Sequence, residues 1–157
     1  MGALLGNDVV VQLGFVVRDV EKTGAKFAEF FGVECPPTCT SGDPDVVKGS
    51  YRGEPTRASC RMKFFETPSL QIELIQPDDT PSVWRDFLNE KGEGMHHIAF
   101  RVKNTDEAVK KLEEKGYPLL QRGLYANASG QYAYIDAQED LKMILELLED
   151  FDKTSEE

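Results

Sequence analysis

The sequence lacks the long apolar segments that carry a protein into or across a membrane. No apolar run approaches the ~20 residues that a membrane-spanning helix requires. Residues 1–15 contain no basic stretch and no small-residue cleavage site, so this pattern predicts no secretory signal peptide. We therefore expect a cytoplasmic protein with no membrane partner.

Positive charge is also scarce. The chain has 28 Asp and Glu residues against 18 Lys and Arg residues, which gives a formal net charge of −10. Nucleic acids and anionic membranes are bound through basic surfaces, so this balance argues against both as main partners. Part of the acidic excess lies in residues 150–157, which we expect to form a solvated tail.

Cysteine is sparse and unpatterned. Cys35, Cys39 and Cys60 are odd in number and form no CxxC pair. The pattern favours free thiols in a reducing cytoplasm over a disulfide framework.

What the sequence does contain is an internal repeat. Residues 12–27, QLGFVVRDVEKTGAKF, align with residues 97–112, HIAFRVKNTDEAVKKL, and each segment reads as a strand, a polar N-cap and a helix. Residues 71–75, QIELI, align with residues 144–148, ILELL, each a strand with one acid among apolar neighbours. The first pair is offset by 85 residues and the second by 73, so the first half carries about 12 extra residues, which fits an insertion within 36–59.

The repeat predicts two modules, each with the order β-α-β-β-β. The first spans residues 8–76, a linker with a short helix spans 77–93, and the second spans 94–149. In the helix expected over 20–31, we predict an apolar stripe of Val20, Phe27, Phe30 and Phe31. Elsewhere we expect the strands 8–17, 58–66, 70–76, 96–102, 131–137 and 142–149 and the helices 83–89 and 104–115. We expect loop with at most one short strand over 36–59, and mostly loop over 118–130.

Four polar side chains interrupt these strands at matching positions. Because strand residues alternate between faces, Gln12, Glu73, His97 and Glu146 should all point away from the helix of their own module. Each of them alone has an ordinary structural explanation, such as a salt bridge or a hydrogen bond. Burying all four is costly unless they are paired or bound, and one cation would satisfy them together. His96 should point to the other face, as a core residue or a support for the ligands.

This arrangement resembles the vicinal oxygen chelate superfamily, which includes glyoxalase I and methylmalonyl-CoA epimerase. The resemblance covers about residues 8–149. It implies an α+β fold in which paired βαβββ modules form a cupped, barrel-like mixed sheet around a metal site. Residues 92–120 are most similar to methylmalonyl-CoA epimerase, where a double His also opens this strand. The ligands that the resemblance implies are similar to those of zinc-type glyoxalase I, namely Gln12, Glu73, His97 and Glu146.

A mixed nitrogen and oxygen donor set suits one divalent ion, with Zn²⁺, Co²⁺, Ni²⁺ or Mn²⁺ as candidates. The resemblance implies that Glu146 abstracts an α-proton to give a metal-stabilised enediolate, and that Glu73 can return the proton. Return to the same carbon gives an epimerase of the methylmalonyl-CoA epimerase type. Return to the neighbouring carbon gives glyoxalase I (lactoylglutathione lyase) chemistry on a thiol hemithioacetal.

Two other activities of the superfamily are less favoured. Drug-binding proteins of the bleomycin-resistance type lack the metal ligands that are present here. An extradiol dioxygenase needs two His and one carboxylate on its iron. His96 and His97 are neighbours on one strand, so they cannot both face one metal ion.

Substrate recognition has weaker signals. Arg52, Arg57 and Arg122 lie in predicted loops and are candidates for clamping a phosphate or carboxylate of a small-molecule substrate, with ordinary surface charge as the alternative. Trp84, in the linker helix, should pack in the core. Many members of the superfamily dimerise, so the resemblance also implies a homodimer.

Overall fold

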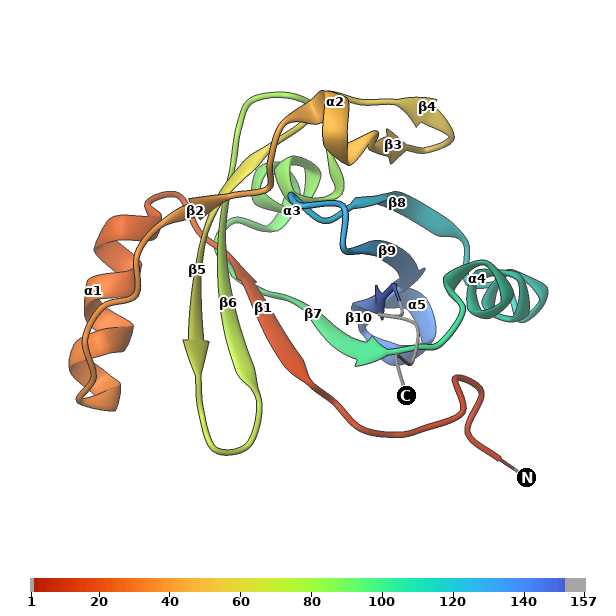
Figure 1. Ribbon diagram of the computed structural model, residues 1–157, viewed down its shortest axis with the longest axis horizontal. Helices are drawn as coiled ribbons and strands as arrows, with labels where there is room; N and C mark the ends of the chain where they lie inside the picture. Colours follow the sequence, from red (N-terminus) through yellow and green to blue (C-terminus); the bar gives the residue numbers. More distant parts are fainter. Residues whose placement is uncertain (1, 152–157) are drawn as a thin grey trace, which may run out of the picture.

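A single curled sheet organises the chain. The computed structural model describes residues 2–151, over which ten strands form one sheet in the order β2-β5-β6-β1-β7-β10-β9-β8-β3-β4 (Figure 1). The sheet contains both parallel and antiparallel pairs, and five helices accompany it over the same residues. The predicted α+β class with a cupped mixed sheet is therefore confirmed. No helix in this part of the chain is long and apolar enough to span a membrane.

The first half of the chain supplies one side of the sheet and the helix α1. Asp19 caps α1 by accepting a hydrogen bond from the backbone N–H of Lys22, and Gly32 ends it at a φ of 68°. The main elements are β1 (Gln12–Val16), α1 (Val20–Phe31), β5 (Cys60–Glu66) and β6 (Gln71–Pro77). β1 and β6 run parallel, and β5 pairs antiparallel with the outer edge of β6.

The apolar stripe predicted for α1 is only partly correct. The residues of α1 that are buried against the sheet are Val20, Gly24 and Ala28, spaced four apart, with Phe27 partly buried beside them. Phe30 is 83% exposed. Two residues beyond Ala28 is about 200° around a helix, so Phe30 falls on the outer face. The small side chains of Gly24 and Ala28 instead let the helix approach the sheet closely.

Residues 36–59 hold more structure than the loop that we expected. The segment contains β2 (Cys39–Thr40), α2 (Pro44–Val47), β3 (Ser50–Tyr51) and β4 (Glu54–Pro55). β2 extends the sheet beside β5, whereas β3 pairs with β8 in the second half of the chain. The insertion therefore contributes to both edges of the curled sheet.

The second half, like the first, begins with a strand followed by a long helix and ends on two long strands. It contains β7 (Gly94–Arg101), α4 (Thr105–Glu114), β8 (Leu119–Leu124), β9 (Gly130–Ala137), the short α5 (Gln138–Leu141) and β10 (Met143–Asp150). Asn104 caps α4 through the N–H of Glu107. Residues 118–130 were expected to be mostly loop, and β8 forms within them. Of the predicted acidic tail, Asp150 ends β10 and residues 152–157 lie outside the described residues.

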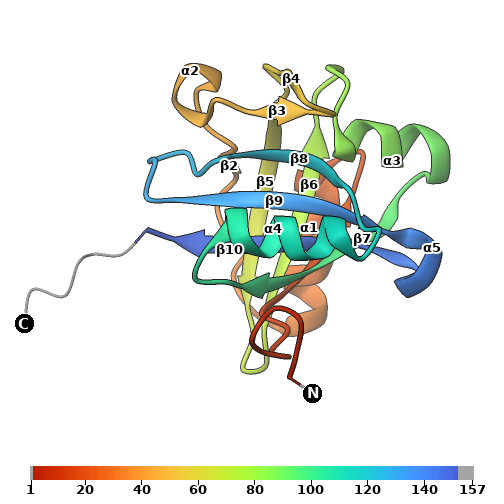
Figure 2. The same cartoon turned by 90° about the vertical axis from the view of Figure 1, so that its right-hand side faces the viewer.

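The two halves meet where β1 pairs antiparallel with β7. α1 and α4 cover the outer side of the curled sheet at opposite ends (Figures 1 and 2). Each packs on its own apolar cluster. The inner side of the sheet carries a third apolar cluster, which includes Val16, Tyr134 and Ile144, together with the polar residues of the strands. The linker helix α3 (Val83–Lys91) packs against β6, β1 and β7, and Trp84 is buried as expected.

Candidate metal centre

The four predicted ligands lie on four adjacent strands of the sheet. Gln12 is on β1, Glu73 on β6, His97 on β7 and Glu146 on β10, and the strand order is β6-β1-β7-β10. All four side chains are buried, with at most 6% of the residue exposed. The structure therefore brings together residues that are up to 134 positions apart in the chain.

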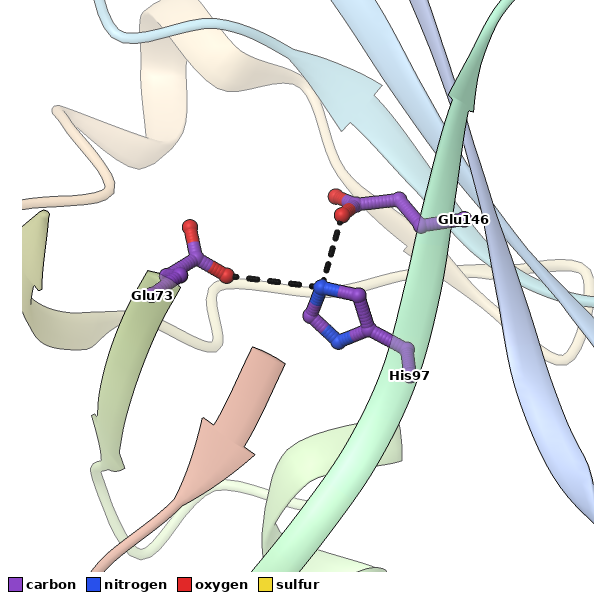
Figure 3. A group of neighbouring side chains, drawn as sticks. All are labelled: Glu73, His97 and Glu146. Carbon is purple, nitrogen blue, oxygen red and sulfur yellow. Dashed lines mark ion pairs between the residues drawn. The ribbon is translucent and has the colours of Figure 1, made fainter. Parts of the chain in front are cut away.

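Three oxygen atoms converge on one nitrogen at this point. His97 Nε2 lies 2.9 Å from Gln12 Oε1 and 2.9 Å from Glu146 Oε2. Glu73 Oε1 lies 3.6 Å from the same nitrogen and approaches it from a different direction than Glu146 (Figure 3). One donor atom each from Glu73, His97 and Glu146 fall within 4.8 Å of one another. The spacing suits simultaneous binding of one ion.

The hydrogen bonding of this cluster is incomplete without a cation. A single imidazole nitrogen carries at most one proton, so it cannot donate to three oxygen atoms. Among the described residues, Glu73 Oε1 and Glu146 Oε2 are buried and have no hydrogen-bond partner. A buried acceptor left unpaired costs about 1–3 kcal/mol, and more when it is charged. A divalent ion would satisfy both carboxylates, the amide oxygen and the imidazole, so the residues present fit a metal.

The protonation of the cluster follows from its burial. Burial raises the pKa of Glu146 from 4.5 to about 8, against a smaller lowering by the hydroxyl of Tyr134. Burial also raises the pKa of Glu73 well above its ordinary value, and repulsion by Glu146 adds to this. Burial lowers the pKa of His97 from 6.5 to about 3, so its imidazole is neutral at pH 7. A neutral imidazole and basic carboxyl groups are suited to a divalent cation.

Gly14 is a functional position that we did not predict from the sequence. It pairs with Glu73 on one side and with His97 on the other. A Cβ at Gly14 would lie 1.9 Å from Cε1 of His97, so the imidazole occupies the space that any other residue would fill. The available signal was a glycine inside a strand, two residues after Gln12, because such glycines often mark a close approach.

A cavity of about 450 Å³ opens beside the four ligands. Gln12, Glu73 and Glu146 line it, together with residues from both halves of the chain and from the insertion. Its aromatic and apolar wall consists of Met62, Phe64, Leu124, Tyr125, Tyr132, Tyr134 and Leu148. Cys39, Thr40 and Ser41 of the insertion also line the cavity. The cavity is large enough for a small organic molecule that reaches the ion site.

The three arginines proposed from the sequence do not line this cavity. Arg57 pairs with Asp45 at 2.7 Å, and Arg122 pairs with Asp106 at 2.7 Å. Arg52 packs its guanidinium over the ring of Tyr51. Each of the three thus has a partner on the surface.

A different arginine reaches the cavity. Arg101 lines it and is paired with Asp150 at 2.8 Å. His97, Ala99 and Arg101 alternate along β7, so strand parity was the signal that could have identified Arg101.

Comparison with known proteins agrees with the fold. Residues 11–134 match the model of the Glyoxalase/Bleomycin resistance protein/Dioxygenase superfamily. The chain belongs to this superfamily, which is also called the vicinal oxygen chelate superfamily.

Individual relatives are distant. The crystal structure of methylmalonyl-CoA epimerase from Mycobacterium tuberculosis is 21% identical, with 96% of this chain and 92% of that chain covered and a TM-score of 0.64. A methylmalonyl-CoA epimerase in complex with methylmalonyl-CoA and NH4+ is 18% identical, covers 90% of this chain and 94% of that chain, and has a TM-score of 0.61. The uncharacterized protein YqjC of Bacillus subtilis (strain 168) is 34% identical over 87 residues, which are 55% of this chain and 62% of YqjC. The matched part thus spans about three fifths of that relative.

Proposed function

We propose that this protein is a divalent-metal-dependent epimerase or isomerase that removes a proton from the carbon next to a carbonyl group. The observation that carries this proposal is the pair of buried carboxylates, Glu73 and Glu146, on either side of His97 at the wall of a cavity. Two carboxylates that face one small space can take a proton from a bound molecule and return it.

The four side chains have separate roles in this proposal. Gln12, Glu73, His97 and Glu146 would hold the ion, which would supply Lewis-acid polarisation of the carbonyl oxygen of the substrate. Glu146 is the base, because its buried carboxylate lies beside His97 and also lines the cavity that would hold the substrate. Glu73 is the group that returns the proton from the other side of the site.

The carbon that receives the proton decides between two reactions. An epimerase acting on a CoA thioester is our first choice, and the fold similarity to methylmalonyl-CoA epimerases supports it. A glyoxalase I-type isomerisation of a thiol hemithioacetal is the second candidate. It is supported by the Gln12 and Glu73 donors, which are similar to those of zinc-type glyoxalase I. A homodimer stays a prediction. All four ligands come from one chain, so the proposed site does not require a second subunit.

Solvent exchange tests the proposal directly. The protein is loaded with Zn²⁺, Co²⁺, Ni²⁺ or Mn²⁺ and incubated in D₂O with methylmalonyl-CoA in one arm and the methylglyoxal–glutathione hemithioacetal in the other. Mass spectrometry then follows deuterium at the carbon next to the carbonyl. We expect exchange or isomerisation with one of the two substrates and none with Glu146→Gln. Wild-type protein that binds an ion but leaves both substrates unchanged would overturn the assignment.

A further inference from the structure

His96 lies directly behind the predicted ligand His97. It is 1% exposed, and its ring stands edge-on to the rings of His97 and Phe87, with interplanar angles of 89° and 87°. Both of its nitrogen atoms have partners. His96 Nδ1 lies 2.9 Å from His97 Nδ1, and His96 Nε2 lies 3.3 Å from the carbonyl oxygen of Val83.

These two contacts determine where the protons lie. A carbonyl oxygen can only accept, so His96 Nε2 carries the proton that it donates to Val83. His96 is 1% exposed and forms no ion pair with an acidic side chain of the described residues, so its ring is neutral and carries one proton. His96 Nδ1 is therefore an acceptor, and His97 Nδ1 must be the donor in the contact between the two rings. His97 Nε2 is then left with a lone pair, and it faces the oxygens of Gln12 and Glu146.

We infer that His96 is a positioning residue that holds the proton of His97 on Nδ1 and so directs the Nε2 lone pair into the ion site. The inference rests on the proposed metal-dependent function. The opposite tautomer of His97 would place a proton on Nε2, where the ion has to bind. A hydrogen bond that fixes the tautomer of a metal-ligating histidine typically changes metal affinity ~10–100-fold when it is removed.

The linker helix anchors this hydrogen-bond chain. Val83 begins α3, and its backbone N–H donates to the buried Oε1 of Gln121 at 2.9 Å. Ser82 caps the helix by accepting from the N–H of Arg85. The carbonyl of Val83 is thus held in place by contacts on both sides of the residue. The segment between the two halves of the chain therefore also positions a metal ligand.

Three substitutions separate hydrogen bonding from packing. His96→Phe keeps an aromatic ring beside Phe87 but removes both hydrogen bonds. His96→Gln keeps an acceptor for His97 Nδ1–H and a donor for the Val83 carbonyl. Phe87→Leu is the matched control, because it removes an aromatic contact with His96 and leaves both hydrogen bonds in place.

The experiment measures Zn²⁺ affinity by competition with a chelator, and the histidine tautomers of the metal-free protein by ¹H–¹⁵N NMR. The chain has only two histidines, so untagged protein gives a spectrum of two rings. We expect the His97 proton on Nδ1 in the wild type, a ~10–100-fold loss of affinity in His96→Phe, and affinities within a few-fold of the wild type in His96→Gln and Phe87→Leu.

Two results would overturn the inference. The first is a His97 proton on Nε2 in the metal-free wild type, a measurement that stands even if His96→Phe does not fold. The second is wild-type Zn²⁺ affinity in a folded His96→Phe protein. Both differ from failure of the proposed function, in which the wild type binds Zn²⁺ with the expected tautomer but catalyses no exchange at the carbon next to a carbonyl.

Discussion

Gly14 and His97 lie opposite each other on β1 and β7, and the imidazole of His97 fills the space where a side chain at Gly14 would lie. The position of the predicted nitrogen ligand therefore depends on the absence of a Cβ one strand away. A glycine weakens the strand that contains it, but here it leaves the space that the His97 ring needs to approach β1 closely.

Gly14→Ala should displace the His97 ring and weaken metal binding. A Cβ 1.9 Å from a ring carbon forces the ring or the backbone to move, which we expect to lower the free energy of unfolding by about 1–3 kcal/mol. Zn²⁺ affinity should fall at least tenfold, because the nitrogen no longer points at the carboxylates. Gly2→Ala, whose Cβ would meet nothing within 4 Å, is the control and should leave both quantities unchanged. Equal Zn²⁺ affinity for Gly14→Ala and the wild type would contradict this role.

The four ligands of the candidate metal centre could be predicted because the alternation of strand residues and the internal repeat can both be read directly from the sequence. Gln12, Glu73, His97 and Glu146 are each an isolated polar residue on a strand, and the repeat paired them. Gly14 and the His96–Val83 contact could not be predicted in this way. They depend on the register of β1 against β7 and on where α3 packs, and both are set by long-range contacts.

Long-range contacts also explain where the predicted fold was wrong. β8 has Gln121 buried and hydrogen-bonded to the backbone of Val83, so its polar residue is satisfied by tertiary structure that the sequence pattern does not reveal. The predicted apolar stripe of α1 included Phe30, which is large and apolar, on the face that packs on the sheet. The face of α1 that packs on the sheet was decided instead by the small residues Gly24 and Ala28, which allow the closest approach.

Glu146→Gln should remove the proposed base and one anionic ligand together. Proton abstraction by a positioned carboxylate typically contributes 10²–10⁴-fold, so we expect the exchange rate to fall by at least about 100-fold. Metal content should fall as well, since the amide carries no charge. The exposed residue Glu139 provides the matched control, and Glu139→Gln should keep both full activity and full metal content. Unchanged metal content in Glu146→Gln would remove Glu146 from the set of ligands.

Arg101→Gln should affect substrate binding and not the ion site. Arg101 lines the cavity, is partly exposed and is already paired with Asp150. We therefore expect it to add only weakly to the binding energy of an anionic substrate. For an anionic substrate we expect KM to rise by roughly threefold with little change in kcat. Arg57→Gln removes another exposed, ion-paired charge that does not line the cavity, and KM should then stay the same. A larger rise in KM for Arg57→Gln than for Arg101→Gln would place the substrate on another surface.

The free energy of unfolding of the metal-free protein should depend on pH because Glu73 and Glu146 have raised pKa values in the folded state. The folded protein raises the pKa of Glu146 from 4.5 to about 8, so it retains a proton that the unfolded chain releases, and stability falls as the pH rises between those values. His97 acts in the opposite direction, because its pKa is lowered from 6.5 to about 3 and stability therefore rises with pH over that range. Burial also lowers the pKa of His96, which acts in the same direction as His97. The carboxylates and the histidines therefore oppose each other below pH 6.5, and above it the histidines no longer contribute.

Urea unfolding between pH 6.5 and 8 is therefore the informative measurement. With a chelator present, we expect the free energy of unfolding to decrease by about 2 kcal/mol per pH unit, because the two carboxyl groups together retain between one and two protons. Saturating Mn²⁺ should abolish this decrease, because the ion binds the deprotonated carboxylates and so takes over the role of the proton. Glu146→Gln with chelator should show a shallower slope, since it has lost one of the two titrating groups. A flat profile for the metal-free wild type would mean that the two carboxylates do not share a desolvated site, and it would contradict the metal centre and the proposed base together.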